Sequence, residues 1–169
     1  MKSARQRAVT PDPLEAGQES VWDFPRPPRV EPARHHLVVR FDSTVLADTT
    51  RGLRVLETSH PPTYYFPSDD CELDALVVGS GGSFCEWKGH AVHYDLALGE
   101  ATMAHVAWSY PNPTPAFAEL RDHLAFYPAK LTCTVDGEVA TPQPGGFYGG
   151  WVTSAVAGPF KGAPGTAFW

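Results

Sequence analysis

The sequence predicts a mainly β protein with one short helix and long irregular termini. Glycine and proline together account for 32 of the 169 residues, 15 and 17 respectively, and this content favours turns over long helices. Runs rich in β-branched and aromatic residues, such as LVVRF at 37–41, recur between turn residues. Hydrophobic residues reach 43%, and a chain of this length fits one domain with a single sizeable core.

Three parts of the chain differ in composition. Residues 1–34 are rich in proline, which removes backbone donors and favours an extended arm. Trp22 and Phe24 in this arm are too apolar for a purely solvated tail, so we expect it to lie across the domain or a neighbouring subunit. Residues 35–141 carry the β elements of the domain, and the Gly/Pro-rich segment 142–169 is expected to wrap around that same domain.

The first half of the domain predicts a hairpin and three further strands. The hairpin covers 35–49 and turns at Asp42 and Ser43. Strands are predicted at 54–58, at 63–66 and at 73–78, and the glycine-rich stretch 79–83 is predicted to be a flexible loop.

The second half predicts two more hairpins around a long strand and a helix. The segments on either side of Lys88 and Gly89 form one hairpin, and residues 101–110 are long enough for a central strand. Residues 116–124 place Phe117, Leu120 and Leu124 at helical spacing, which predicts the helix. The last hairpin turns at Asp136-Gly137, a dipeptide suited to a type I′ turn.

Charge and hydropathy limit the partners. The net charge is −6, and from Leu37 onward seven basic residues face fourteen acidic ones, so a nucleic-acid partner is not expected. No apolar run approaches the ~20 residues of a transmembrane helix, and no secretory signal follows the basic start. We therefore expect a cytoplasmic monomer or homodimer whose partner is a small molecule.

Cysteine and glycine patterns predict neither a cofactor nor a metal. Cys71, Cys85 and Cys133 are odd in number and lack the close spacing of structural zinc ligands, which favours reduced thiols in the cytoplasm. The G-x-x-x-x-G-K-[ST] phosphate loop is absent from the sequence. We expect no cofactor and no metal site.

The candidate site centres on residues 85–95, which place a thiol, an ammonium, two imidazoles, two aromatic rings and two carboxylates around one tight turn. Alternation along adjacent strands predicts a crease of aromatic rings with one carboxylate and one ammonium. Such a crease suits a flat polar metabolite, for example a nucleoside or nucleotide, and the competing interpretation is an ordinary β core with an ion pair at its rim. The predicted ligand-binding residues are Glu57, Tyr65, Trp87, Lys88, Tyr94 and Trp108.

Two other classes of function stay open. In the first, the protein is a transferase or hydrolase in which Lys88 transfers protons with Glu57 or Asp95, or in which Cys85 is a nucleophile. In the second, the protein is an interaction module whose Trp22 arm and aromatic tail dock a partner or a second copy.

Several motifs are also similar to those of a known family. They are VWDFPRPPRVEP, RVLETSHPPTYYFP, CEWKG followed by HYD, AWSYPNPTPAF, HLAFYP and the tail FYGGWVTSAVAGPFKGAPGT. Together they resemble a family of small bacterial proteins, domain of unknown function 427, over residues from Val21 to Trp169.

The resemblance implies a fold and leaves the activity unknown. The fold is a β-tent, two antiparallel sheets packed at a steep angle, as in the thalidomide-binding domain of cereblon and in B-type methionine sulfoxide reductases. Those relatives carry Cys-x-x-Cys zinc sites, which this sequence lacks. The family also bears the label nucleotidyltransferase-like, yet such enzymes combine a Gly-Ser turn with Asp-x-Asp, and only Gly79-Ser80 is present here.

Overall fold

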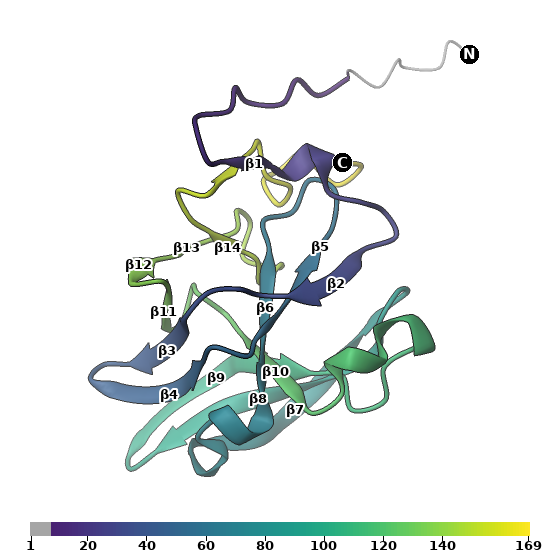
Figure 1. Cartoon of the computed structure of the whole chain (residues 1–169). Coiled ribbons are helices and arrows are strands. Elements are labelled where there is room, and N and C mark those ends of the chain that lie inside the picture. The colour runs from purple at the N-terminus through teal and green to yellow at the C-terminus, as the bar shows by residue number, and fades with distance from the viewer. Residues whose placement is uncertain (1–7) are drawn as a thin grey trace.

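The computed structural model describes residues 8–169, and antiparallel strands in two large sheets dominate it (Figure 1). The larger sheet has seven strands. In spatial order they are β2 (Arg29–Pro32), β5 (Leu53–Leu56), β6 (Thr63–Pro67), β10 (His123–Phe126), β9 (Ala101–Ser109), β8 (Gly89–Leu98) and β7 (Leu76–Cys85).

The smaller sheet has four strands and contains two of the predicted hairpins. Its order is β12 (Glu138–Val139), β11 (Thr132–Val135), β3 (Leu37–Phe41) and β4 (Thr44–Thr49). Asp136 and Gly137 join β11 to β12 with φ values of 49° and 85°, the left-handed backbone that a type I′ turn requires. In Figure 1, β6 runs steeply across the direction of β3 and β4. The mainly β prediction is confirmed, and the arrangement is β-tent-like.

Short elements at both ends of the chain meet at one end of the molecule (Figure 1). The parallel pair is β1 (Glu19–Ser20) with β15 (Val156–Ala157), and the antiparallel pair is β13 (Thr141–Pro142) with β14 (Trp151–Val152). The helical segments are all 3₁₀ turns: η1 (Val21–Asp23), η2 (Ser68–Asp70), η3 (Leu73–Ala75) and η4 (Pro115–Leu120).

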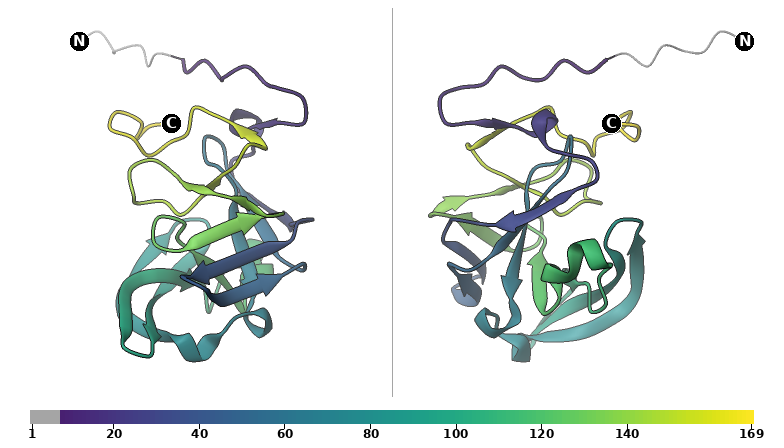
Figure 2. Two further views of the ribbon diagram at one scale, coloured as in Figure 1. Left: turned by 90° about the vertical axis from the view of Figure 1, so that its left-hand side faces the viewer. Right: turned by 45° about the vertical axis from the view of Figure 1, so that its right-hand side comes forward.

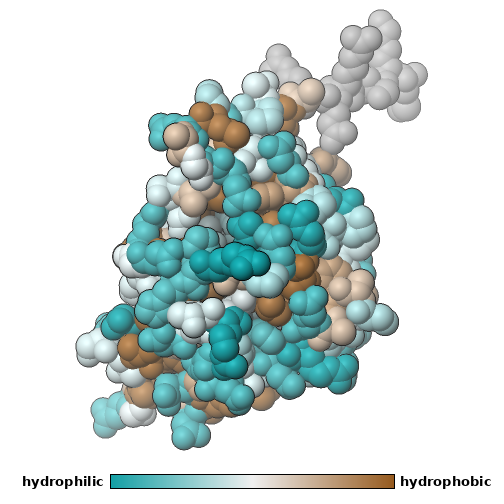
Figure 3. Space-filling view, viewed as in Figure 1, coloured by the Kyte–Doolittle hydropathy of each residue, from teal (hydrophilic) through white to brown (hydrophobic). Residues whose placement is uncertain are grey.

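In the middle of the seven-stranded sheet, β6 and β10 are buried on both faces, which explains their continuous apolar runs, whereas the edge strand β7 is mostly exposed. Tyr64 and Phe66 face the four-stranded sheet and belong to the first core cluster, whereas Tyr65, between them, belongs to a second cluster on the opposite face. Phe117 and Leu120 of η4 cover part of this opposite face, on the concave side of the curved β7–β9 strands (Figure 2). On the face shown in Figure 3, hydrophobic side chains form separate patches among hydrophilic ones. None of the helices within residues 8–169 has the length and apolar character needed to cross a membrane.

The predicted helix is shorter than expected. It covers Pro115–Leu120 as 3₁₀ structure, whereas the prediction extended it to Leu124. Asp122 has a φ of 59°, which breaks the helix, and His123 begins β10. Leu120 and Leu124 therefore do not share one face of a helix. They belong to two different elements and pack on opposite faces of the sheet, so their spacing only resembles that of a helix.

The prediction of a flexible loop at 79–83 is wrong. These residues continue β7, which stays paired with β8 on both sides of a register shift between Val78 and Gly82. The glycines therefore form a β-bulge, which adds unpaired residues to one strand without ending it.

The proline-rich arm contributes packed structure. Its residues 29–32 form β2, the edge strand beside β5, and Pro32 is tolerated there because an edge strand has a free side. Val21 is fully buried and Phe24 is 6% exposed, in a third cluster with Leu56 and Val156. The arm thus lies across its own domain, one of the two placements expected.

Candidate functional site

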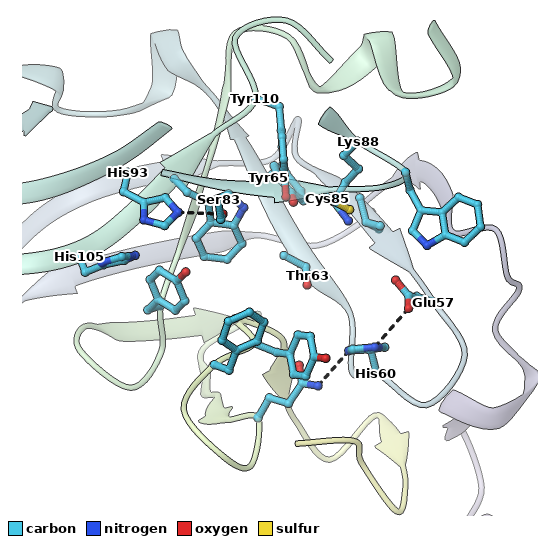
Figure 4. A pocket seen from close by; sticks show the side chains of 18 of the residues that line it. Glu57, His60, Thr63, Tyr65, Ser83, Cys85, Lys88, His93, His105 and Tyr110 are labelled. Carbon is cyan, nitrogen blue, oxygen red and sulfur yellow. Dashed lines mark hydrogen bonds and ion pairs between the residues drawn. The ribbon is translucent and has the colours of Figure 1, made fainter. Parts of the chain in front are cut away.

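A cavity of about 760 Å³ opens on the face of the seven-stranded sheet that carries the second core cluster. Its lining comes from β5, β6 and the loop between them, the β7–β8 hairpin, β9, the segment that follows β10, and the C-terminal tail. Figure 4 shows side chains from these elements around the cavity. Its volume falls within the ~300–1,000 Å³ typical of small-molecule sites.

Aromatic rings follow one another along the cavity wall. The His93 and His105 centroids lie 3.9 Å apart, and the other neighbouring centroids lie 4.5 to 6.5 Å apart, within the range in which aromatic pairs attract each other. From one end to the other the rings are His93, His105, Tyr127, Trp108, Tyr65 and Tyr110. The wall thus joins the imidazole pair to the hairpin that bears Lys88, whose Nζ lies 5.8 Å from the Tyr110 ring centroid.

Most of the predicted site residues line this cavity, and two do not. Those that line it are Glu57, Tyr65, Cys85, Trp87, Lys88 and Trp108. Tyr94 packs against the first core cluster, and its hydroxyl shares a 2.9 Å hydrogen bond with Ser109 Oγ. On β8 the residue that lines the cavity is His93, so its neighbour Tyr94 faces the other side of the sheet.

Asp95 lies outside the cavity lining, in a β-bulge between β8 and β9. Tyr94 pairs with Ala107 and Leu96 with Met103, so additional residues of β9 lie opposite Asp95. One of them, His105, has a φ of 62°, and its backbone N–H donates to Asp95 Oδ1 at 2.9 Å. The carboxylate therefore satisfies a backbone donor that lacks a ladder partner.

Gln143 fixes the tautomer of the neutral His60 imidazole, which lines the cavity. The amide orientation of Gln143 follows from two neighbours: its Oε1 accepts from Gly150 N at 3.2 Å, and its Nε2 donates to Lys161 O at 2.8 Å. The same Nε2 lies 2.9 Å from His60 Nδ1, which must accept. In the neutral imidazole the proton is then on Nε2, which faces Glu57 Oε2 at 3.2 Å (Figure 4).

Glu57 is held as a carboxylate with one oxygen uncommitted. Its Oε2 receives Arg26 Nη2 at 3.2 Å as well as His60, and among residues 8–169 no hydrogen bond engages Oε1. Burial alone raises the pKa of Glu57, but the hydrogen bond from His60 and the charges of Lys88 and Arg26 outweigh burial, so the pKa lies below its usual value of 4.5.

Lys88 supplies the opposite charge without pairing with Glu57. The two groups act on each other electrostatically, yet within the described part of the chain the Lys88 ammonium has no carboxylate within 4.0 Å and no hydrogen bond. Its partners are the rings of Tyr110 and Phe117, at 5.8 and 5.9 Å. An ammonium with free donors beside a carboxylate with a free acceptor can bind two edges of one polar ligand.

The three thiols occupy different environments. Cys85 lines the cavity, whereas Cys133 is buried in the first core, where burial raises its pKa well above 9.0. Cys71 Sγ donates to Pro67 O at 3.3 Å, and burial raises its pKa to about 12. In the part of the chain from residue 8 to 169, no three His, Cys, Asp or Glu side chains form a group that could hold a metal ion.

Sequence reasoning missed cavity residues at both ends of the site. Gln143 and Tyr148 reach the site from the tail, where Tyr148 packs edge-on against His60 at 4.7 Å between centroids. Ser83 lies at the opposite end, 3.1 Å from Nε2 of His93, which is one of the two imidazoles of the predicted segment 85–95. The tail gave no periodic signal, and Ser83 lay in the predicted loop, so no local pattern could have placed Gln143, Tyr148 or Ser83 in the site.

Comparison with known proteins places the chain in one family. The family model described as domain of unknown function (DUF427) matches residues 29–140, about two thirds of the chain. No curated protein matches the sequence. The matched segment contains Glu57, Lys88 and the strands that carry most of the aromatic wall. The chain therefore belongs to the DUF427 family.

Proposed function

We propose that the cavity binds a flat, polar small molecule, such as a nucleoside or nucleotide, in the cytoplasm. One observation carries the proposal: a continuous aromatic wall ends beside an ammonium and a carboxylate that face the same cavity and do not pair with each other. The rings supply apolar contact to a planar heterocycle, and the two charges supply hydrogen bonds to its polar edge.

Burial of the charged groups favours this binding mode. The Glu57 side chain is 20% exposed, and its lowered pKa keeps it ionised at neutral pH. A ligand N–H that reaches Oε1 forms a charge-assisted hydrogen bond in a partly desolvated site, where such bonds are stronger than in water. Lys88 offers the complementary donor to a ligand carbonyl or to another acceptor.

Thermal unfolding in the presence of nucleosides and nucleotides tests the proposal, because a ligand that binds only the native state raises the melting temperature. We expect a rise for the wild type and for Arg40→Met, which alters an exposed cation on the four-stranded sheet. Lys88→Met keeps the apolar stem but removes the ammonium, and it should lose the rise, as should Glu57→Gln. A melting temperature that no compound changes, or a rise that survives both cavity variants, would overturn the proposal.

An enzyme that uses Lys88 and Glu57 for proton transfer is the second candidate. It is favoured by the free Oε1 of Glu57 in the same cavity as Lys88. Asp95 is not part of this candidate because its carboxylate holds the bulge at His105. Mass spectrometry of a bound compound after incubation separates the two: conversion that Lys88→Met abolishes indicates an enzyme, and an unchanged compound indicates a binding protein.

The Gly79-Ser80 pair gives little support to the nucleotidyltransferase-like label. Gly79 and Ser80 belong to the bulge in β7, and Gly79 lies so close to Asp95 that a Cβ at this position would be 2.6 Å from Oδ1. The glycine at position 79 is therefore explained by its packing against Asp95, without a role in nucleotide transfer.

The interaction module is the weakest candidate. Trp22 and Trp169 pack against each other at 5.5 Å between centroids, and Trp22 Nε1 donates to Pro159 O at 2.9 Å. The aromatic residues of the arm and tail thus have partners within the chain.

A further inference from the structure

The end of the cavity opposite Glu57 carries a separate group of polar side chains. Ser83 Oγ lies 3.1 Å from His93 Nε2, the His93 and His105 ring centroids are 3.9 Å apart, and Tyr127 follows at 5.8 Å from His105. Figure 4 shows His93 and His105 on the side of the cavity away from Glu57 and His60. All four side chains line the same cavity.

These groups retain unused hydrogen-bonding capacity. Among residues 8–169, no hydrogen bond to protein engages the His105 imidazole or the Tyr127 hydroxyl. His93 is 8% exposed, and its buried Nδ1 also lacks a partner. The His105 imidazole and the Tyr127 hydroxyl are partly exposed and line the cavity, so they can form hydrogen bonds with a ligand there.

The Ser83–His93 pair can serve a hydroxyl group in either role. If His93 Nε2 accepts from Ser83, the serine oxygen is left to accept from a ligand O–H. If Nε2 carries the proton and donates, the serine O–H is left to donate to a ligand oxygen. A ligand hydroxyl is both donor and acceptor, so it fits both states of the pair.

This end is poorly suited to a phosphate group. Burial, and the neighbouring His105, hold the pKa of His93 below its usual value of 6.5, so the ring is neutral at pH 7. The nearby cation that lines the cavity is Lys130, which is exposed and whose Nζ donates to Ala104 O at 2.6 Å. A phosphate there would meet one ammonium, which already donates one of its three N–H groups to Ala104 O, and no arginine among the cavity-lining residues, whereas sugar hydroxyls need no charge.

We propose that Ser83, His93, His105 and Tyr127 form a sugar-binding subsite, so that the cavity takes unphosphorylated nucleosides in preference to free nucleobases and nucleotides. This inference rests on the proposed function: the heterocycle lies along the aromatic wall toward Glu57 and Lys88, and the sugar hydroxyls reach the Ser83–His93 pair. It adds the class of ligand and the direction in which that ligand lies.

Isothermal titration calorimetry on the full chain tests the subsite. The probes are adenosine, guanosine, cytidine and uridine, their free bases and their 5′-monophosphates, each titrated into wild type, Ser83→Ala, Ser83→Thr and Ser80→Ala. Ser80 is the matched control because it is an exposed serine of the same strand that does not line the cavity.

For the base that binds best, we expect the nucleoside to bind about ten times more tightly than the free base and more tightly than the monophosphate. Ser83→Ala should weaken nucleoside binding about five- to tenfold, the value of one hydrogen bond, and should leave free-base binding within about twofold. Ser83→Thr should restore nucleoside binding because it keeps the hydroxyl, and Ser80→Ala should match the wild type.

The outcomes separate the two proposals. If bases or nucleosides bind but Ser83→Ala weakens both equally, or if the monophosphate binds more tightly than the nucleoside, the sugar subsite is wrong and the binding function stands. If none of the probes binds to the wild type, both proposals are overturned.

Discussion

Asp95 Oδ1 accepts a hydrogen bond from the backbone N–H of His105 at 2.9 Å, across the bulge that joins β8 to β9. His105 is one of the few non-glycine residues with a positive φ, so its backbone conformation depends on local support. Through this bond, a residue outside the cavity holds in place a ring of the cavity wall.

Removal of the Asp95 carboxylate should destabilise the protein. We expect Asp95→Ala to lower the free energy of unfolding by about 1–3 kcal/mol, because it leaves a partly buried N–H without an acceptor. Asp95→Asn keeps an oxygen acceptor and should cost less. Urea denaturation measures both values. Asp74→Asn, at an exposed carboxylate, is the control, and equal stability of Asp95→Ala and wild type would show that the bond is not required.

Protonation of Glu57 should lower the stability of the protein at acid pH. Its pKa is lower in the folded state than the usual 4.5, so its contribution is complete above about pH 4.5 and is lost as the pH falls through the folded-state value. Urea denaturation at pH 7 and at pH 3.5 should show a larger loss of stability for wild type than for Glu57→Gln. Glu100→Gln, in an exposed turn, should behave as wild type, and parallel curves for wild type and Glu57→Gln would contradict the prediction.

Gly149 lets the tail lie directly on the Trp108 indole. A Cβ built at this position would be 2.2 Å from Trp108 Cη2, so Gly149→Ala forces the tail or the ring to move. We expect a loss of about 1–3 kcal/mol and altered tryptophan fluorescence. Gly99→Ala is unsuitable as a control because Gly99 has a φ of 60°. Ala140→Gly, at a buried site away from Trp108, serves instead and reports the loss of stability from a substitution elsewhere in the core. Unchanged fluorescence in Gly149→Ala would mean that the contact is not close in solution.

Trp22 should stabilise the packing of the arm on the tail without controlling assembly. Trp22→Ala removes the contact with Trp169 and the hydrogen bond to Pro159 O, and we expect faster proteolysis of both termini. Light scattering coupled to gel filtration should give the same mass for the variant and the wild type. A change of mass in Trp22→Ala would instead favour the interaction module, in which the arm docks a second copy.

Local chemistry made the strands and turns predictable. The Asp136-Gly137 turn and the hairpins at Asp42 and Lys88 depend on residues that are adjacent in the chain, and the structure contains all three. Where regular alternation holds, aromatic residues of the predicted crease line the cavity, as Tyr65 and Trp108 do.

The wrong predictions for residues 79–83 and 116–124 lie where the chain departs from regular strands and helices. Residues 79–83 look like a loop because glycine weakens a strand, but β8 supplies a pairing partner that keeps them in β7. The apolar spacing at 116–124 looks helical, but packing divides these residues between two elements. The η4 turn covers one face of the sheet, whereas Leu124 belongs to β10 and faces the other.

The β class, the hairpins and the residue types of a polar aromatic site follow from the sequence, because propensity, turn chemistry and alternation act over a few residues. Long-range packing turns Tyr94 and Asp95 away from the cavity and joins Gln143 to Glu57 through His60. The placement of Tyr94 depends on which face of β8 meets the cavity, that of Asp95 on the bulge, and that of Gln143 on a tail 83 residues beyond His60 in the chain. Such contacts form because the whole chain must bury its apolar surface and pair its polar groups at once. A short segment of sequence therefore does not predict them.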